Sequence, residues 1–172
     1  ALSITEFMNK MRLVWLKLTD VFTGKLAKVY QQIDKRTPAL IIYTTGTTGE
    51  PKPAVLCHEN IIVQNQILER GIDYKGDRKN FSILVNLPPS HVGCVTETFM
   101  TTMFIGGTAI LLRIFDTKAT LEAIEQHKVK VIGQIPTMFR MLWNFPEYEK
   151  YDLSSLEFVA YAGSAVDTTF LK

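Results

Sequence analysis

Two patterns of hydrophobic and polar residues alternate along most of this chain. Short apolar runs predict β-strands, and apolar residues spaced by three and four predict helices with one buried face. From residue 81 onward, strands and helices are expected in turn. The predicted strands are Ser82–Asn86, Thr108–Leu112, Val129–Gly133 and Leu156–Tyr161. Strands separated by helices of this length predict right-handed crossovers and a largely parallel sheet, so the fold class is α/β.

Residues at the expected helix boundaries agree with this pattern. Asn60 is placed to cap a helix that runs to about Arg70, and Gly71 would end it. Asp116 predicts a second helix start, and Pro136 suits the first position of a third helix. The helix after the strand at residues 82–86 is expected to bury an apolar stripe formed by Val92, Val95, Phe99 and Met103.

The first 37 residues also show helical spacing. Met8, Met11 and Trp15 would share one face of a helix, and Val29 and Ile33 suggest a second, short helix. A basic amphipathic helix of this kind could lie on a membrane, but such stripes more often pack against protein. We therefore expect a helical N-terminal segment over residues 1–37 and the main domain over residues 38–172.

Composition narrows the range of functions. Hydrophobic residues make up 47% and charged residues 21% of the 172 residues, which is typical of a globular protein. The net charge of +2 gives no basic surface for nucleic acid. Cys57 and Cys94 lie far apart and predict buried, reduced thiols, and the scattered histidines suggest no metal site. With no apolar run long enough to span a membrane, we expect a cytoplasmic protein.

Three stretches follow strands directly and are candidates for ligand binding. The first is the Gly/Thr-rich loop at residues 43–53, which lies between the apolar runs Ala39–Tyr43 and Ala54–Cys57. Glycines that allow unusual backbone conformations, threonine hydroxyls and the Lys52 ammonium would together suit phosphate. A plain hairpin turn explains the composition equally well. The loop lacks the Walker A spacing and the dinucleotide fingerprint.

The second stretch is Leu87–Gly93, which contains His91, and the third is Tyr161–Ala165, which consists mostly of small residues. Ligands of open parallel sheets gather at the carboxyl ends of the strands, so the three stretches are expected to converge. His91 alone is a weak signal, because a single histidine after a Pro-Pro turn more often begins a helix. Small residues would let a ligand approach the backbone closely.

The loop sequence Tyr-Thr-Thr-Gly-Thr-Thr-Gly-Glu-Pro-Lys-Pro resembles the Tyr-Thr-Ser-Gly-Thr-Thr-Gly-x-Pro-Lys-Gly signature of the adenylate-forming superfamily. It departs from that signature at Thr45 and Pro53. The Leu-Pro-Pro-Ser-His-Val-Gly and Tyr-Ala-Gly-Ser-Ala-Val segments are similar to two further motifs of these enzymes. The resemblance covers roughly Pro38–Val166 and identifies the chain as part of the N-terminal domain of an acyl-CoA synthetase, of the long-chain fatty acid–CoA ligase type.

The resemblance implies ATP, Mg²⁺ and coenzyme A as cofactors and substrates, and a carboxylic acid, most simply a fatty acid, that is converted to an acyl-adenylate and then to a thioester. It implies Lys52 and Thr48 as catalytic residues. The ATP phosphates would be bound by Thr44, Thr45, Gly46, Thr47, Thr48, Gly49 and Lys52. The acyl and adenylate pocket would contain His91, Ala162, Gly163, Ser164 and Ala165. No residue of this chain is implied as a metal ligand.

Two alternatives stay open at this point. One is an amino-acid adenylation domain that supplies a carrier protein, and the other is a nucleotide-binding relative without catalysis. In the family, the adenine-stacking aromatic, the magnesium glutamate, the ribose aspartate and the lysine of the small C-terminal domain come after Val166. We therefore expect the chain alone to be an inactive fragment without the C-terminal domain, and its uncovered apolar surface to cause self-association.

Overall fold

The computed structural model describes residues 24–45, 49–72, 80–168 and 170. The chain divides into two compact units, Ala1–Thr37 and Pro38–Lys172. In the first unit the described residues form one helix, α2 (Lys25–Gln32), as the spacing of Val29 and Ile33 predicts. Gly24 precedes α2 with a left-handed φ of 57°, a conformation that glycine adopts without steric cost. The expected helix around Met8 and Trp15 lies outside the described residues.

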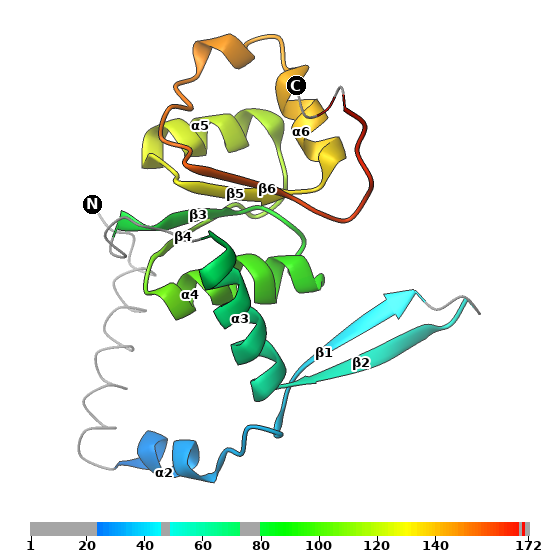
Figure 1. The fold of residues 1–172 in the computed structure, drawn as a ribbon, viewed down its shortest axis with the longest axis vertical. Helices are drawn as coiled ribbons and strands as arrows, with labels where there is room; N and C mark the ends of the chain where they lie inside the picture. The colour runs from blue at the N-terminus through cyan, green and yellow to red at the C-terminus, as the bar shows by residue number, and fades with distance from the viewer. Residues whose placement is uncertain (1–23, 46–48, 73–79, 169, 171–172) are drawn as a thin grey trace, which may run out of the picture. The chain divides into compact units, whose positions relative to one another are not determined.

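The second unit begins with a hairpin of two antiparallel strands, β1 (Pro38–Thr45) and β2 (Pro51–Cys57). It continues with alternating helices and strands (Figure 1). These are α3 (His58–Ile72), β3 (Ser82–Val85), η2 (Gly93–Met100), α4 (Thr101–Ile105), β4 (Thr108–Leu111), α5 (Thr117–His127), β5 (Val131–Gln134), α6 (Pro136–Trp143), η3 (Tyr148–Lys150) and β6 (Phe158–Tyr161).

Among the described residues, the four strands β3 to β6 form one sheet in the order β4-β3-β5-β6, and every neighbouring pair is parallel. This confirms the predicted α/β fold with a largely parallel sheet. The chain leaves β3 toward one edge of the sheet, to β4, and leaves β5 toward the other edge, to β6. The strand order therefore reverses between β3 and β5, and the crevice at such a reversal is where open α/β sheets bind ligands.

Helices cover both faces of this sheet (Figure 1). On one face, Leu84 and Ile132 pack with Leu121 of α5 and Phe139 of α6. On the other, neighbouring strand residues join Cys94 of η2 and Ile105 of α4 in a second core; these are Phe81, Ile83, Val85 and Val131. The two cores result from the alternation of side chains along each strand, which sends successive residues to opposite faces.

Several helix boundaries are as the sequence predicts. The Asp116 carboxylate accepts a 2.7 Å hydrogen bond from the Ala119 N–H and caps α5, and Pro136 occupies the first turn of α6. The prediction that Asn60 caps the start of α3 is wrong, because α3 already begins at His58; the Asn60 side chain, inside the first turn, accepts the Cys57 N–H at 3.0 Å. The prediction that Gly71 ends this helix is wrong, because α3 continues to Ile72.

The helix between β3 and β4 differs from its predicted form. Residues 93–100 form a π-helix, whose wider turn changes which residues share a face. Met103, expected in the buried stripe, is 61% exposed, whereas four threonines are buried. They are Thr96, Thr98, Thr101 and Thr102. The hydroxyls of Thr96, Thr98 and Thr102 donate to backbone carbonyls of the preceding turn, and that of Thr101 donates to Asn65 Oδ1 at 2.9 Å, so all four are hydrogen-bonded inside the core.

Candidate functional site

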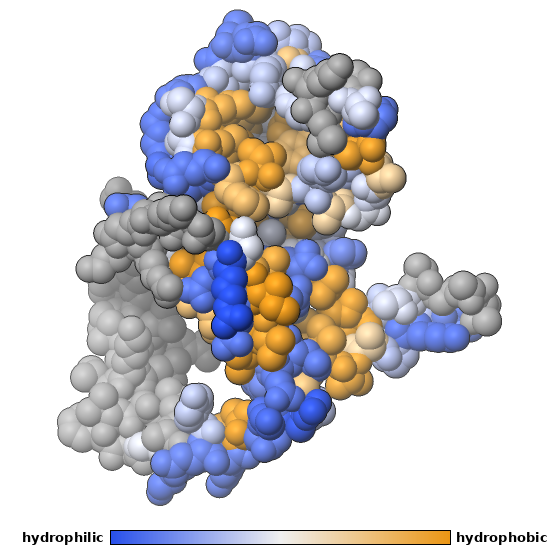
Figure 2. Space-filling model, viewed as in Figure 1, coloured by the Kyte–Doolittle hydropathy of each residue, from blue (hydrophilic) through white to orange (hydrophobic). Residues whose placement is uncertain are grey.

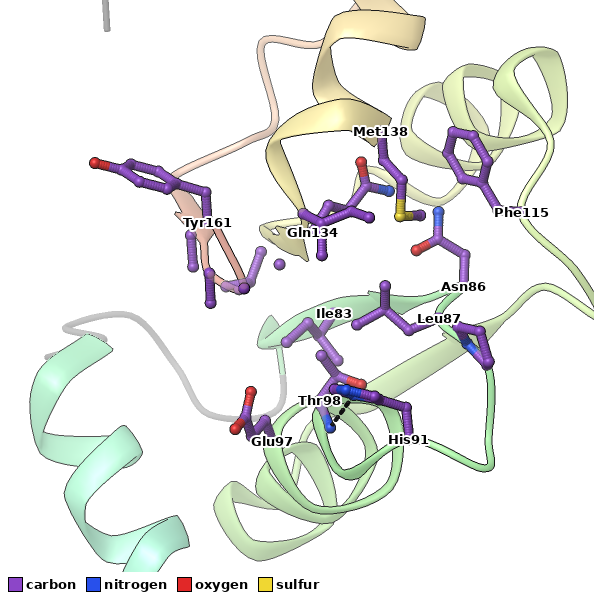
Figure 3. Close-up of a pocket in the computed structure, with 18 of the residues that line it drawn as sticks. Ile83, Asn86, Leu87, His91, Glu97, Thr98, Phe115, Gln134, Met138 and Tyr161 are labelled. Carbon is purple, nitrogen blue, oxygen red and sulfur yellow. Dashed lines mark hydrogen bonds between the residues drawn. The ribbon is translucent and has the colours of Figure 1, made fainter. Parts of the chain in front are cut away.

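A cavity of about 810 Å³ opens at the carboxyl ends of β3, β5 and β6 (Figure 3). It lies at the reversal of strand order, and α3, η2 and the segment after β4 complete its walls. Most of the lining is apolar, for example Leu87, Ile135 and Met138. Its volume is within the range of small-molecule sites, roughly 300–1,000 Å³. The cavity is therefore suited to a mainly apolar ligand of moderate size.

His91 lines this cavity just before η2 begins. Its Nδ1 accepts the Gly93 N–H at 3.0 Å, the interaction drawn as a dashed line in Figure 3. A neutral imidazole whose Nδ1 accepts a hydrogen bond carries its proton on Nε2. The Gly93 backbone thus fixes the histidine as a hydrogen-bond donor through Nε2. His91 lies at the start of a helix, as predicted, and it lines the cavity, whereas its role in the acyl and adenylate pocket stays a prediction.

Small residues after β6 form another wall. Ala162 and Gly163 line the cavity, and Gly163 has a left-handed φ of 90°. A Cβ added at Gly163 would lie 3.2 Å from Ile135 Cγ2. Glycine therefore serves both the backbone conformation and the close approach to the neighbouring strand end. Ser164 and Ala165 follow in the same segment and do not line the cavity, so their assignment to the pocket stays a prediction.

Two carboxamide side chains, which were not predicted from the sequence, also line the cavity. Asn86 follows β3 and is 1% exposed, and Gln134 ends β5 and is 3% exposed. Asn86 Nδ2 donates to Thr120 Oγ1 at 3.1 Å. Asn86 Oδ1 and both amide atoms of Gln134 have no hydrogen-bond partner among the described residues. Only the register of β3 against β5 places them together, and a single sequence does not reveal that register.

Two charged residues, Glu97 and Arg113, also line the cavity. Glu97, on η2, accepts a hydrogen bond from Gln64 of α3 at 3.3 Å. Arg113 follows β4 and is exposed.

Burial raises the pKa of the Cys94 thiol, which keeps this side chain neutral within the core. Cys57 is half-buried rather than buried, and its thiol donates to Asn60 Oδ1.

The Gly/Thr-rich loop connects the antiparallel strands β1 and β2, so the chain forms a hairpin here, as the loop composition allowed. Thr44 Oγ1 donates to the Lys52 carbonyl across the ladder at 3.3 Å, and Gly49 has a left-handed φ of 86°. Thr45 pairs with Pro51 through the backbone register. Three of the predicted phosphate-binding residues, Gly46, Thr47 and Thr48, lie outside the described residues. None of the loop residues that are described lines the cavity.

Apolar side chains are exposed elsewhere on the second unit. Ile62, Val63 and Ile67 on α3 are between 44% and 62% exposed, and Ile41 and Val55 of the hairpin are each 55% exposed. Figure 2 shows hydrophobic surface over α3 and over the hairpin. Surface of this kind is where the predicted self-association would occur, and that prediction is tested by oligomeric state in solution.

The described residues contain no group of three or more histidine, cysteine or acidic side chains placed to hold a metal ion. No helix among them combines the length and the apolar character that crossing a membrane requires.

Comparison with known proteins identifies the family. The family model described as "AMP-binding enzyme" matches residues 7–172. The chain belongs to this family. The resemblance of its motifs to the adenylate-forming superfamily is thereby confirmed.

Individual relatives of this AMP-binding chain agree with the family match. It is 32% identical over 141 residues to the indoleacetate–CoA ligase of Aromatoleum aromaticum, a match that covers 82% of the chain and 27% of that protein. It is 34% identical over 149 residues to the mitochondrial medium-chain acyl-CoA ligase ACSF2 of Macaca fascicularis, covering 85% of the chain and 24% of that protein. The chain thus spans about a quarter of the length of these relatives.

A solved structure shows the same fold as this AMP-binding chain. The o-succinylbenzoate CoA synthetase of Bacillus subtilis, bound to a product analogue, superposes with a TM-score of 0.68 at 22% identity. The match covers 81% of the chain and 27% of that structure. The likeness confirms the predicted fold, that of the N-terminal domain of adenylate-forming enzymes.

Proposed function

We propose that the complete protein is an acid–thiol ligase that activates a carboxylic acid with ATP and transfers the acyl group to coenzyme A. The observation that carries this proposal is the apolar cavity at the reversal of strand order, bordered by His91 and by the small residues Ala162 and Gly163. Membership of the AMP-binding family, and relatives named as CoA ligases for an aromatic and a medium-chain acid, support the same reaction.

The apolar lining favours an acid with a hydrophobic body, and a fatty acid is the simplest such substrate. The acyl chain would lie along Leu87, Ile135 and Met138, where burial of apolar area stabilises it by roughly 25 cal/mol per Å². An amino acid would place a charged ammonium group in a lining where the Glu97 carboxylate already accepts a hydrogen bond from Gln64. Since desolvation of an unpaired charge is costly, the fatty-acid reading is preferred over amino-acid activation.

His91 would orient the reacting end of the acid. Its Nε2–H, fixed by the Gly93 N–H on Nδ1, is a donor for an oxygen of the carboxylate or of the acyl-adenylate. The backbone at Ala162 and Gly163 would let the adenylate lie flat against the chain, since no long side chain fills that space. These residues bind and orient, and no residue of this chain serves as a covalent nucleophile.

The Gly/Thr-rich loop would bind the phosphates of ATP. In adenylation, negative charge develops on the departing pyrophosphate, and Lys52, Thr48 and the loop N–H groups would stabilise it. Positive φ at Gly49 suits a loop whose N–H groups point inward.

The test is to incubate the complete protein with ATP, coenzyme A and fatty, aromatic and amino acids, and to identify acyl-AMP and acyl-CoA by mass spectrometry. We expect both products with an apolar acid. Lys52→Ala should lower the rate of acyl-AMP formation by about 10²–10³-fold, as for other losses of a donor to developing charge. Lys28→Ala, at an exposed position on α2, is the matched control.

Products from amino acids alone would instead favour the amino-acid adenylation reading. ATP binding without acyl-AMP from any acid would favour the non-catalytic relative and contradict the proposal.

A further inference from the structure

We propose that Gln134 and Asn86 form a polar subsite in the cavity that receives a hydroxyl group on the acid, remote from its carboxylate. This inference rests on the proposed ligase function and specifies its substrate class as a hydroxylated apolar acid.

The register of the sheet places the two residues side by side. Leu84 of β3 pairs with Ile132 of β5, and Asn86 and Gln134 each lie two residues further along. Side chains two residues apart on a strand point to the same face, so both carboxamides lie on the face that Leu84 and Ile132 share with α5 and α6. They stand at the carboxyl ends of the two strands between which the strand order reverses.

Figure 3 shows how the two side chains lie. The carboxamides of Gln134 and Asn86 point into the same part of the cavity, close to Met138 and Phe115. Both residues thus border a part of the cavity where the neighbouring side chains Met138 and Phe115 are apolar. A ligand that enters this space contacts hydrophobic side chains along its length and meets hydrogen-bonding groups where Gln134 and Asn86 lie.

Buried polar atoms without a hydrogen-bond partner are unusual in a folded protein. More than nine in ten buried polar groups in proteins have a hydrogen-bond partner. Here three atoms lack one among the described residues, and the side chains that carry them are only 1% and 3% exposed. Leucine or methionine would fill the same space without desolvating an amide. A polar ligand group that completes these hydrogen bonds explains why carboxamides occupy both positions.

The free atoms define what that group must offer. Gln134 has a donor, Nε2, and an acceptor, Oε1, and Asn86 has a further acceptor, Oδ1. Turning either amide over exchanges nitrogen and oxygen but leaves Gln134 with one free donor and one free acceptor. A hydroxyl group donates one hydrogen bond and accepts others, which matches this set. Both amides are uncharged, so neither offers a counter-charge to a second carboxylate or to an ammonium group.

The test measures acid-dependent exchange of pyrophosphate into ATP by the complete protein, with paired acids that differ only in a hydroxyl group. The pairs are 4-hydroxycinnamate with cinnamate, and 12-hydroxydodecanoate with dodecanoate. In at least one pair we expect kcat/KM to be more than about tenfold higher for the hydroxylated acid. The acid without the hydroxyl group would leave the buried amides unpaired. Gln134→Leu should reduce that preference to within about threefold, by lowering kcat/KM for the hydroxylated acid and raising it for the other.

Gln126→Leu, the same substitution at an exposed position on α5, should leave the preference unchanged. Gln134→Leu should also raise the melting temperature, because it removes a buried unpaired amide, and this readout shows that the variant folds.

Equal kcat/KM for both members of each pair, or an unchanged preference in Gln134→Leu, would overturn the subsite while leaving the ligase function intact. An effect of Gln134→Leu confined to thioester formation, with exchange unaffected, would also overturn it, because the amides would then serve the thiol. Absence of exchange with every acid is a different result and would contradict the ligase function itself.

Discussion

Replacing Gly107 with alanine should destabilise the sheet, because this glycine lies directly against the preceding strand. Gly107 connects α4 to β4. A Cβ added there would lie 2.6 Å from both the carbonyl oxygen and Cδ1 of Phe81, closer than real Cβ atoms approach other atoms. The ring of Phe81 is fully buried, and its carbonyl accepts the Thr108 N–H at 2.8 Å. The added methyl group must therefore push the start of β4 away from β3.

The expected cost combines two effects. Overpacking a tight contact costs about 1–3 kcal/mol, and weakening the hydrogen bond from Thr108 to Phe81 adds roughly 0.5–1.5 kcal/mol. Gly107→Ala should thus reduce the free energy of unfolding by about 2–4 kcal/mol, a large part of the total for a domain of this size.

Urea denaturation of the chain, followed by circular dichroism, measures this change. Gly71→Ala is the matched control, because Gly71 is helical and no atom lies within 4 Å of its added Cβ. That variant should be as stable as the wild type or more stable by up to about 1 kcal/mol, given the higher helix propensity of alanine. Equal stability of Gly107→Ala and the wild type would refute the inferred close packing of β4 against β3.

Three further substitutions test other parts of the fold. Asp116→Ala removes the cap on the Ala119 N–H and should cost about 1 kcal/mol in urea denaturation. Leu121→Ala empties a fully buried core position and should cost about 2–5 kcal/mol in the same assay. Lys128 holds the pKa of the Asp152 carboxyl below its usual value. The ionised Asp152 therefore stabilises the folded state fully above the unfolded pKa of about 3.9, and this stabilisation is lost as the pH falls below that value. Asp152→Asn should flatten the dependence of stability on pH in that acidic range, as urea midpoints against pH would show.

Each of these predictions has its own contradicting result. A neutral Asp116→Ala would mean that the first turn of α5 does not depend on the cap. A loss below about 1 kcal/mol for Leu121→Ala would place that side chain outside a close-packed core. An unchanged acid dependence in Asp152→Asn would mean that the contact between Lys128 and Asp152 contributes nothing measurable, as is common for exposed ion pairs.

Local signals in the sequence predicted most of the sheet. Apolar runs located β3 to β6 to within a few residues. The central strands β3 and β5 are buried almost throughout, and strands of this kind are almost continuously hydrophobic. Asp116 and Pro136 marked helix starts correctly, since the physical reason for each lies within three residues of the chain. The parallel arrangement followed from the alternation of strands with helices.

Features that depend on contacts between distant parts of the chain were harder to predict from the sequence. The π-helix at residues 93–100 was missed because buried threonines look polar in the sequence, although their hydroxyls are satisfied by backbone carbonyls nearby. The end of α3 was placed too early because Gly71 is helical in its tertiary setting.

The candidate site was predicted in part. His91, Ala162 and Gly163 were expected at the ends of strands, and the cavity includes all three. Gln134 and Asn86 were not expected, because only the strand order and register bring two residues 48 positions apart in the chain to the same face. The role assigned to Lys52 and the rest of the loop stays a prediction.

The most direct test of the account is whether the cavity binds the acid that is activated. Gly133 lines the cavity, and a Cβ there would make ordinary contacts, 3.8 Å from Thr98 Cγ2 and 4.0 Å from Ala160 Cβ. Gly133→Ala should therefore fold normally, whereas the longer side chain of Gly133→Leu would extend into the cavity. Exchange of pyrophosphate into ATP by the complete protein should be retained in Gly133→Ala, and in Gly133→Leu the KM for the acid should rise at least about tenfold while the KM for ATP stays the same. An unchanged KM for the acid in a folded Gly133→Leu protein would contradict the account, because the acid would then bind elsewhere.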